Sequence, residues 1–282
     1  IKKTEEEIEK TKKKVSDKKK VSETKNCVKI TKKDQGVYIY KDILGSKIRI
    51  SKRELKKEIL VKYDCRLQVK YNEWYLIVPY DVNEPTYKKE RNDLCALDPG
   101  VRSFQTIYSE EKVVQIKINK ELLDKLKSKL DHMSSLRDKK LIRKSSYKKR
   151  EFRIYKKIGH LIDEMHHKTI DYITKNYQSI IIPPFESQDM VTNSRNRRLN
   201  RNLLELKHYM FRSRLESKCI LRGCSMIVNT EEYTSKTCGR CGTINEVGTK
   251  DIFTCNKCKL SVDRDVNGAR NIYIKTINKI LC

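Results

Sequence analysis

The sequence lacks any long apolar run. No stretch approaches the roughly 18 consecutive apolar residues of a membrane-spanning helix, and no apolar segment typical of a secretion signal lies near the start. Only 37% of the residues are hydrophobic, so the core has to be concentrated in a few segments. We therefore expect a protein without a membrane span that is intracellular and not secreted.

Acidic residues are also scarce. The chain has 37 Asp and Glu residues against 64 Lys and Arg residues, which gives a formal net charge of +27. A field of this size attracts polyanions, and nucleic acid is the commonest polyanion in a cell. Lysine outnumbers arginine, so compositional bias contributes to the charge without explaining the whole excess. The composition favours a nucleic-acid partner.

Four of the ten cysteines form two Cys-x-x-Cys pairs, Cys238 with Cys241 and Cys255 with Cys258. Two such pairs can hold one ion in a tetrahedron at about 2.3 Å. The spacing predicts a structural zinc ribbon, closed by four thiolates and therefore without chemistry of its own, and an iron–sulfur cluster is the alternative. Metal-bound thiolates indicate a reducing compartment. The other cysteines are predicted to be small core residues, at positions 27, 65, 95, 219, 224 and 282.

The first 90 residues divide in two. Residues 1–26 are almost wholly charged and predict either a disordered basic arm or a frayed helix of a larger domain. Residues 27–90 alternate apolar and polar positions, which predicts a small barrel or curled sheet. A short helix is expected over Ser51–Leu60, with Ser51 and Glu54 forming a capping box. The predicted strands cover residues 28–30, 37–40, 48–50, 65–69 and 74–78.

From residue 91 onward the pattern becomes mixed α/β. A strand over residues 94–97 ends at Asp98, and strands over 103–108 and 112–118 follow. Two amphipathic helices lie within residues 119–177. Three strands that open with an aspartate and are followed by helices have the order of an RNase H-like unit. Further elements are predicted as a strand at 179–182, a helix at 203–222 and a strand at 225–229.

The helices within residues 119–177 are densely basic outside their apolar stripe. Such a surface suits a nucleic-acid groove, and a merely solvated helix face is the alternative. His160, His166 and His167 are not spaced as a metal-binding pair and are predicted to be surface or phosphate-contacting residues. The basic side chains predicted to contact nucleic acid are Arg102, Lys148, Lys149, Arg150, Arg195, Arg197, Arg198 and Arg201.

Two distant aspartates are the candidate catalytic residues. Asp98 stands at the edge of a predicted sheet, directly before Pro99 and Gly100, and Asp265 follows the cysteine segment. Phosphodiester hydrolysis uses pairs of Mg²⁺ or Mn²⁺ ions about 4 Å apart, which prefer carboxylate oxygens. The alternatives are a turn-forming role for Asp98 and a helix N-cap role for Asp265. Asp263 is an alternative ligand, because the two aspartates flanking residue 264 point to opposite sides if the chain is extended.

These segments resemble a known family of nucleases. The segments Leu97–Gly100, Tyr233–Gly242 and Asp263–Ile272, with the Ile-rich strand before Phe185-Glu186, resemble the RuvC-like half of TnpB. The Pro-x-Phe-Glu and Glu-Glu-Tyr-Thr-Ser-Lys-Thr-Cys versions look most like Fanzor proteins, the eukaryotic and viral relatives of TnpB. Type V CRISPR effectors share this nuclease core. The resemblance runs from about residue 28 to residue 280.

The resemblance implies RNA-guided, Mg²⁺-dependent DNA cleavage, with guide RNA and target DNA as partners. TnpB carries a glutamate straight after the middle strand, where this chain has Pro183-Pro184. Fanzor-like members use a glutamate further along, which implies Glu231, with Glu186 as the rival. The protein would then act in the nucleus or wherever the host or viral DNA lies. The sequence starts at Ile1 without a methionine, so a fragment or a processed form is expected.

The predicted organisation follows from the resemblance together with the composition. Residues 1–26 are a remnant of recognition helices or an arm, and 27–90 a β-rich wedge domain. Residues 91–236 form the RuvC-like core with a helical insertion at 119–177, residues 237–260 the zinc ribbon, and residues 261–282 the end of the core. We predict an RNA-guided DNA endonuclease. An inactive RNA-guided DNA-binding regulator and a guide-free, structure-specific nuclease are the alternatives.

Overall fold

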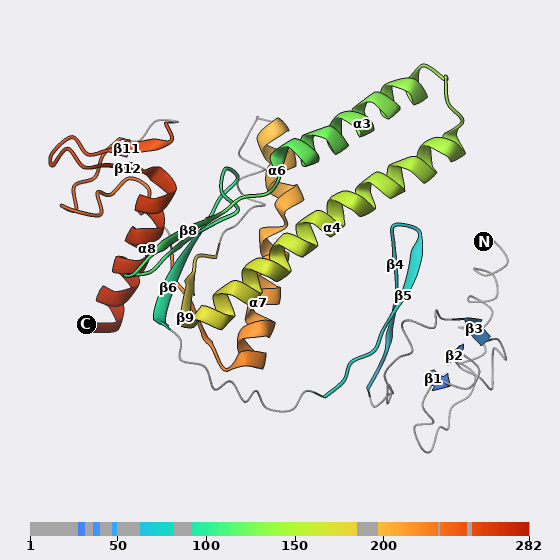
Figure 1. The fold of residues 1–282 in the computed structure, drawn as a ribbon, viewed down its shortest axis with the longest axis horizontal. Coiled ribbons are helices and arrows are strands. Elements are labelled where there is room, and N and C mark those ends of the chain that lie inside the picture. The colour runs from blue at the N-terminus through green and yellow to red at the C-terminus, as the bar shows by residue number, and fades with distance from the viewer. Residues whose placement is uncertain are drawn as a thin grey trace, which may run out of the picture. The chain divides into compact units, whose positions relative to one another are not determined.

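The structure is a computed structural model of the chain. It describes the strands within residues 28–49 and then residues 63–81, 92–184, 197–230, 232–246 and 250–281. The chain divides into two compact units, Ile1–Asn83 and Glu84–Cys282, each of which is described by itself. Figure 1 shows the elements of both units.

The first unit contains short antiparallel strands. Strands β1 (Val28–Thr31), β2 (Gly36–Ile39) and β3 (Lys47–Arg49) form one sheet, and β4 (Arg66–Lys70) pairs with β5 (Glu73–Ile77). The five strands predicted from alternation are confirmed. Tyr71 and Asn72 join β4 to β5 with φ values of 53° and 61°, as a tight two-residue hairpin turn requires. The predicted helix over residues 51–60 lies outside the described residues.

The second unit is built on a mixed sheet of five strands in the order β10-β9-β6-β7-β8. Strands β6 (Asn92–Pro99), β7 (Gln105–Tyr108) and β8 (Val113–Ile116) are antiparallel neighbours. Strands β9 (Tyr177–Ile182) and β10 (Ser225–Val228) run parallel to β6 on its other side. The mixed α/β class predicted from the sequence is therefore confirmed.

Helices cover both faces of this sheet. Helices α3 (Lys120–Asp138) and α4 (Lys144–Asn176) form a hairpin, followed after β9 by α6 (Arg197–Leu206) and α7 (His208–Arg222). Cys95, Leu97 and Ile180 pack in one core cluster with residues of α3, α4 and α7. Helix α8 (Arg264–Leu281) lies on the opposite face, where Ala96 and Ile181 pack against it. Alternate residues of a strand therefore feed two different cores, as the period of two requires.

Two local predictions are wrong. The helix predicted over residues 203–222 is broken at Lys207, whose φ of 50° separates α6 from α7. The break lets Leu206 be buried beside α3 and α4 while His208 stacks on Phe104. His166 is not a surface residue: its side chain is 0% exposed and lies 5.0 Å from the Phe104 ring. His160 and His167 are exposed as predicted.

No helix in the described part of the chain is both long enough and apolar enough to span a membrane.

Candidate metal centres

Asp98 lies where β6 approaches helix α8. Its backbone pairs with Thr106 of β7, and the turn that follows contains Gly100, at which an added Cβ would come within 2.9 Å of the Ser103 carbonyl oxygen. The Asp98 carboxylate lies against the backbone of α8: a Cβ added at Gly268 would stand 2.5 Å from Asp98 Oδ2. Glycine at position 268 therefore makes room for this carboxylate.

Asp265 lies in the first turn of α8, three residues before Gly268. Positions three apart are neighbours on one face of a helix, so Asp265 and the Asp98 carboxylate lie on the same side of α8. Asp263 has a different role. Its Oδ1 accepts hydrogen bonds from the backbone N–H groups of Asp265 at 2.9 Å and Val266 at 3.3 Å, which makes it the N-cap of the helix. The N-cap role considered for Asp265 thus falls to Asp263.

Arg102 joins the aspartates of this region. Its guanidinium donates to Asp265 Oδ2 from Nε at 3.0 Å, and its terminal nitrogens lie 2.8 Å from Asp265 Oδ2, 2.8 Å from Asp263 Oδ1 and 3.0 Å from Asp251 Oδ1. Asp263 and Asp265 would point to opposite sides in an extended chain, but α8 begins between them, at Arg264, and both contact Arg102. Partial burial opposes the charge of Arg102, but the hydrogen bond to Asp265 and the three nearby carboxylates outweigh it and raise its pKa.

The carboxylates of Asp98 and Asp265 suit a hard divalent cation, which prefers oxygen ligands. The space left by the missing side chain at Gly268 supports this fit, because it lets the Asp98 carboxylate reach α8 about one turn beyond Asp265. Both residues predicted as a third acid, Glu186 and Glu231, lie outside the described residues. Within the described residues, no three carboxylates have oxygen atoms close enough together to hold one metal ion.

The residues on either side of position 231 are held by α8. Lys275 Nζ donates to Thr230 Oγ1 at 3.0 Å and to the Glu232 carbonyl oxygen at 3.5 Å. Just before them, Asn229 Nδ2 donates to Thr276 Oγ1 at 2.8 Å, and both groups are buried. The segment that follows β10 is thus fixed to the helix that carries Asp265.

The four cysteines of the paired motifs converge. The sulfur atoms of Cys238, Cys241, Cys255 and Cys258 all lie within 4.8 Å of one another, and two of the Sγ–Sγ distances are 3.5 and 3.6 Å. A tetrahedron with metal–sulfur bonds of about 2.3 Å has sulfur atoms roughly 3.8 Å apart. The arrangement fits a zinc ribbon. Hydrogen bonding to Thr243 lowers the pKa of the Cys241 thiol to about 6, which favours the thiolate that binds metal.

The first cysteine pair is fastened to α8 by two asparagines. Asn267 Nδ2 donates to the Thr237 carbonyl oxygen at 2.8 Å, and its Oδ1 accepts from the Gly239 N–H at 3.1 Å. Asn271 Nδ2 donates to the carbonyl oxygens of Thr234 and Thr237, each at 2.7 Å. Asn267 and Asn271 are 1% and 7% exposed. These hydrogen bonds therefore hold the ribbon to the same end of α8 that carries Asp265.

Sequence reasoning missed Gly268, Asn267 and Asn271, although one signal was present. These residues stand three, two and six positions after Asp265, respectively, and so share the first turns of its helix. Small and amide side chains at such positions are unusual for a helix interior. Their roles follow only from the tertiary structure, in which Gly268 contacts Asp98 and the two asparagines contact the ribbon.

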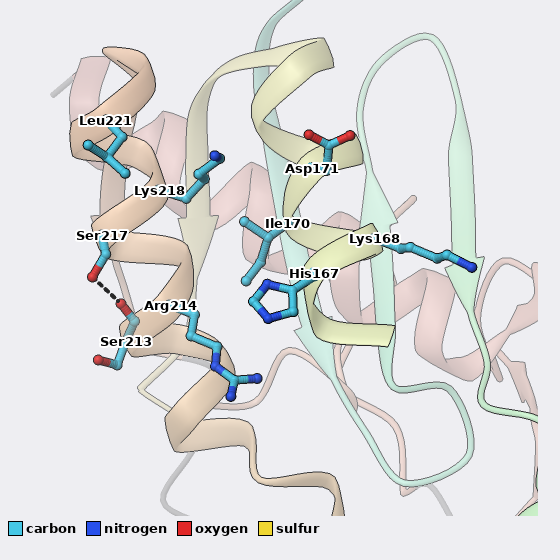
Figure 2. Close-up of a pocket in the computed structure, with 9 residues that line it drawn as sticks. All are labelled: His167, Lys168, Ile170, Asp171, Ser213, Arg214, Ser217, Lys218 and Leu221. Carbon is cyan, nitrogen blue, oxygen red and sulfur yellow. Dashed lines mark hydrogen bonds between the residues drawn. The ribbon is translucent and has the colours of Figure 1, made fainter. Parts of the chain in front are cut away.

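Two buried histidines pack against Phe104, which lies in the loop that follows Asp98. His166 and His208 stack on Phe104 at centroid distances of 5.0 and 5.1 Å. His166 Nδ1 lies 3.2 Å from the Arg214 guanidinium, which can only donate, so Nε2 carries the hydrogen and donates to the Leu206 carbonyl oxygen at 2.9 Å. Burial is the main reason that the pKa of each histidine falls to about 4. Figure 2 shows the neighbouring pocket of α4 and α7, into which Arg214 projects.

The residues predicted to contact nucleic acid fall in different places. Arg102 belongs to the aspartate cluster described above. Lys148, Lys149 and Arg150 are exposed near the start of α4, and Arg201 of α6 forms an ion pair with Asp131 of α3 at 3.3 Å. Arg195 lies outside the described residues, and for positions 197 and 198 only the helical backbone of α6 is described.

The fold and the site define a mixed α/β protein in which the cysteine cluster and Asp98 both contact α8, the helix that carries Asp265. Comparison with known proteins gives two family matches: residues 77–194 match the family described as "Probable transposase" and residues 208–272 match "Cas12f1-like, TNB domain".

Three relatives illustrate the similarity. "Putative transposase A625R" of Paramecium bursaria Chlorella virus 1 is 34% identical over 229 residues, which cover 76% of this chain and 50% of that protein. "TnpB-like protein L79" of Acanthamoeba polyphaga mimivirus is 27% identical, with coverages of 77% and 43%. "Putative RNA-guided DNA endonuclease InsQ" of Escherichia coli (strain K12) is 26% identical, with coverages of 77% and 56%.

Among solved structures, a Cas12f1–sgRNA–target DNA complex matches with 20% identity and a TM-score of 0.47, over 73% of this chain and 54% of that one. The chain spans about half the length of the curated relatives that it matches. The chain belongs to the TnpB family, which is related to the type V CRISPR effectors.

Proposed function

We propose that the chain carries the nuclease half of an RNA-guided, metal-dependent DNA endonuclease. The observation that carries this proposal is the contact between the Asp98 carboxylate and α8 at Gly268, one helical turn beyond Asp265. The sheet supports it, because three antiparallel strands followed by two parallel ones have the order expected of an RuvC-like, RNase H-like core. The name of the Escherichia coli relative supports RNA guidance and DNA as the substrate.

In this proposal Asp98 and Asp265 hold two Mg²⁺ ions with one glutamate. Bound Mg²⁺ would supply an activated water and charge stabilisation for the leaving 3′ oxygen. The chain's own residues fix the geometry: β6 and Gly268 place the Asp98 carboxylate, and Arg102 restrains Asp265 through Oδ2. Mutation of a residue that orients a metal-ligating carboxylate through a hydrogen bond typically lowers metal affinity or activity by about 10–100-fold.

We assign Glu231 as the third acid, with Glu186 as the alternative. Support comes from its neighbours, Thr230 and Glu232, which Lys275 of α8 holds on either side of position 231. Paired variants test the choice: Glu231→Gln should abolish cutting while Glu186→Gln keeps it, and the reverse result would move the role to Glu186.

We further propose that zinc in the cysteine cluster holds the ribbon in shape. Guide RNA and target DNA are the proposed partners, and the protein would act wherever the host or viral DNA lies, the nucleus included. Target sequence would be read by pairing with the guide, whereas lysines and arginines would hold phosphates.

The experiment that tests the proposal compares two aspartates of one strand. Asp98→Asn keeps the shape of the side chain and should abolish Mg²⁺-dependent cleavage of a guide-matched DNA while leaving RNA binding intact. Asp93→Asn changes an exposed aspartate near the other end of β6 and should cut normally. Wild-type cutting by Asp98→Asn would refute the active-site assignment. Cutting of branched DNA without RNA would favour a guide-free nuclease, and binding without any cutting by the wild-type chain would favour an inactive regulator.

A further inference from the structure

Charge is distributed unevenly along α4. Its first part, residues 144–157, contains seven Lys and Arg residues and one carboxylate, Glu151. Its second part, residues 158–176, contains two lysines and three acids. Those acids are neutralised within the fold: Glu164 pairs with Lys168, Asp171 with Lys175 and Arg222, and Asp163 with Arg214. The excess positive charge therefore belongs to the first part alone.

The first part also exposes aromatic rings. Phe152 is 38% exposed and Tyr155 is 45% exposed. They are three residues apart on one flank of α4, and Lys148 stands four residues before Phe152, so the three side chains are neighbours. Further along α4 the same flank carries Gly159, His166 and Ile170, which are buried. His166 packs there against Phe211 of α7, at a centroid distance of 5.4 Å. The flank of α4 that α7 covers is therefore apolar along its length, and its uncovered part is exposed to solvent.

Side-chain contacts join α3 and α4 at the tip of the exposed part of the hairpin. The Arg137 guanidinium stands 4.7 Å above the Tyr147 ring, which joins the end of α3 to the start of α4. The Tyr147 hydroxyl donates to Glu151 at 2.7 Å, so the one carboxylate of the basic part is engaged inside the hairpin. Figure 1 shows this part of α3 and α4 extending away from the central sheet. A preformed surface of this kind binds without a large ordering cost.

We propose that the exposed flank of α4 is a binding surface for single-stranded nucleic acid, with bases stacked on Phe152 and Tyr155 and phosphates held by Lys148 and Lys149, which stand four and three residues before Phe152. A polyanion matches the charge of this part of the helix, and unpaired bases match rings that are offered to solvent. A duplex satisfies the charge but keeps its bases stacked inside. The inference rests on the proposed function, for which it names the surface and the form of the nucleic acid.

The test measures binding separately from cleavage. The whole chain carrying Asp98→Asn is titrated into fluorescently labelled oligo-uridine, oligo-thymidine and duplex probes of about 15 units, and anisotropy gives each Kd. The double variant Phe152→Ala, Tyr155→Ala should raise the Kd for the single strands at least about tenfold, since each stacked base contributes roughly 1–3 kcal/mol. The pair Phe152→Tyr, Tyr155→Phe should bind as the parent does. Tyr209→Ala, which removes a 76% exposed ring of α7, is the matched control and should have no effect.

The charge is tested through salt dependence. Lys148→Ala with Lys149→Ala should weaken binding and reduce the slope of log K against log salt by about 1.4, because each phosphate contact in a single strand contributes about 0.7. Lys168→Ala with Lys175→Ala, whose lysines pair with acids of α4, should leave the slope unchanged.

Two results would overturn the proposal: an aromatic double variant that binds within twofold of the parent, or a duplex weakened as much as the single strands. Loss confined to RNA would assign the surface to the guide, and loss confined to DNA would assign it to an unwound target strand. Failure of the Asp98 cleavage test would leave these binding results unaffected, so the two hypotheses are judged separately.

Discussion

Gly268→Ala separates the stability of α8 from the geometry of the proposed catalytic site. An alanine Cβ at this position would stand 2.5 Å from Asp98 Oδ2, whereas real Cβ atoms keep about 3.0 Å or more from such neighbours, so the oxygen has to move by 0.5 Å or more. The displaced group is the end of a side chain, which rotates at little cost. Alanine is also favoured over glycine in a helix interior by about 1 kcal/mol. The unfolding free energy should therefore stay the same or rise.

Activity should change in the opposite direction. A displacement of about 1 Å at a reacting centre commonly costs roughly a hundredfold in rate, so a shift of half that size or more predicts a loss of about 10–100-fold. The assay is single-turnover cleavage of a guide-matched DNA in Mg²⁺, together with Mn²⁺ binding by calorimetry, which should also weaken. Asn278→Ala, at an exposed position of the same helix, is the control for helix propensity alone.

Two outcomes would refute this reasoning. Wild-type cutting by Gly268→Ala would mean that the contact with α8 does not position Asp98 for the reaction. A large fall in melting temperature would mean that the Asp98 side chain cannot yield and that the contact is part of the packing of the sheet.

Three further predictions concern the ribbon and the core. Cys238→Ser should lose bound zinc, measured by atomic absorption, and lower the melting temperature, and unchanged zinc content would contradict the ribbon. Asn271→Ala removes two hydrogen bonds to backbone carbonyl oxygens, one buried and one partly buried, and should cost about 1–3 kcal/mol in denaturant unfolding. A cost near zero would show that other contacts hold the first cysteine pair to α8. His166 and His208 each have a pKa of about 4 in the folded protein, against about 6.5 in the unfolded chain, so they bind fewer protons when the protein is folded. The free energy of unfolding should therefore be highest above pH 6.5 and fall as the pH drops toward 4, by up to about 3 kcal/mol for each histidine. His208→Phe should make that fall smaller, and an unchanged pH dependence would contradict the assignment.

Much of the fold followed from local pattern. Each strand of the central sheet was predicted, because residues 94–97 form a short apolar run and residues 179–182 contain three β-branched isoleucines, both at the lengths of buried strands. The α3–α4 hairpin was predicted from its apolar stripe. The break at Lys207 was not, because nothing in residues 203–222 marks it. It arises where Leu206 and His208 have to reach different neighbours.

The histidines show the same division between sequence and structure. Offsets along α4 could exclude a pair of metal ligands, but they placed His166 on the surface, and this was wrong. The ring is buried because Phe104, from the loop after β6, stacks on it, and Arg214 of α7 meets its Nδ1. Both partners are distant in the sequence, so the sequence of the helix contains no signal for them.

By itself, the sequence predicted the positive charge that favours a nucleic-acid partner, the four cysteines that converge and the two candidate aspartates, because these depend on residue type and short spacing. Only the tertiary structure decided that Asp263 caps α8 while Asp265 pairs with Arg102, that Gly268 makes room for Asp98, and that Asn267 and Asn271 hold the ribbon to the same helix. Apart from the local cap, these roles arise from contacts between segments more than 25 residues apart, up to 170 in the case of Asp98 and Gly268. Such contacts exist only once the sheet and α8 have packed together.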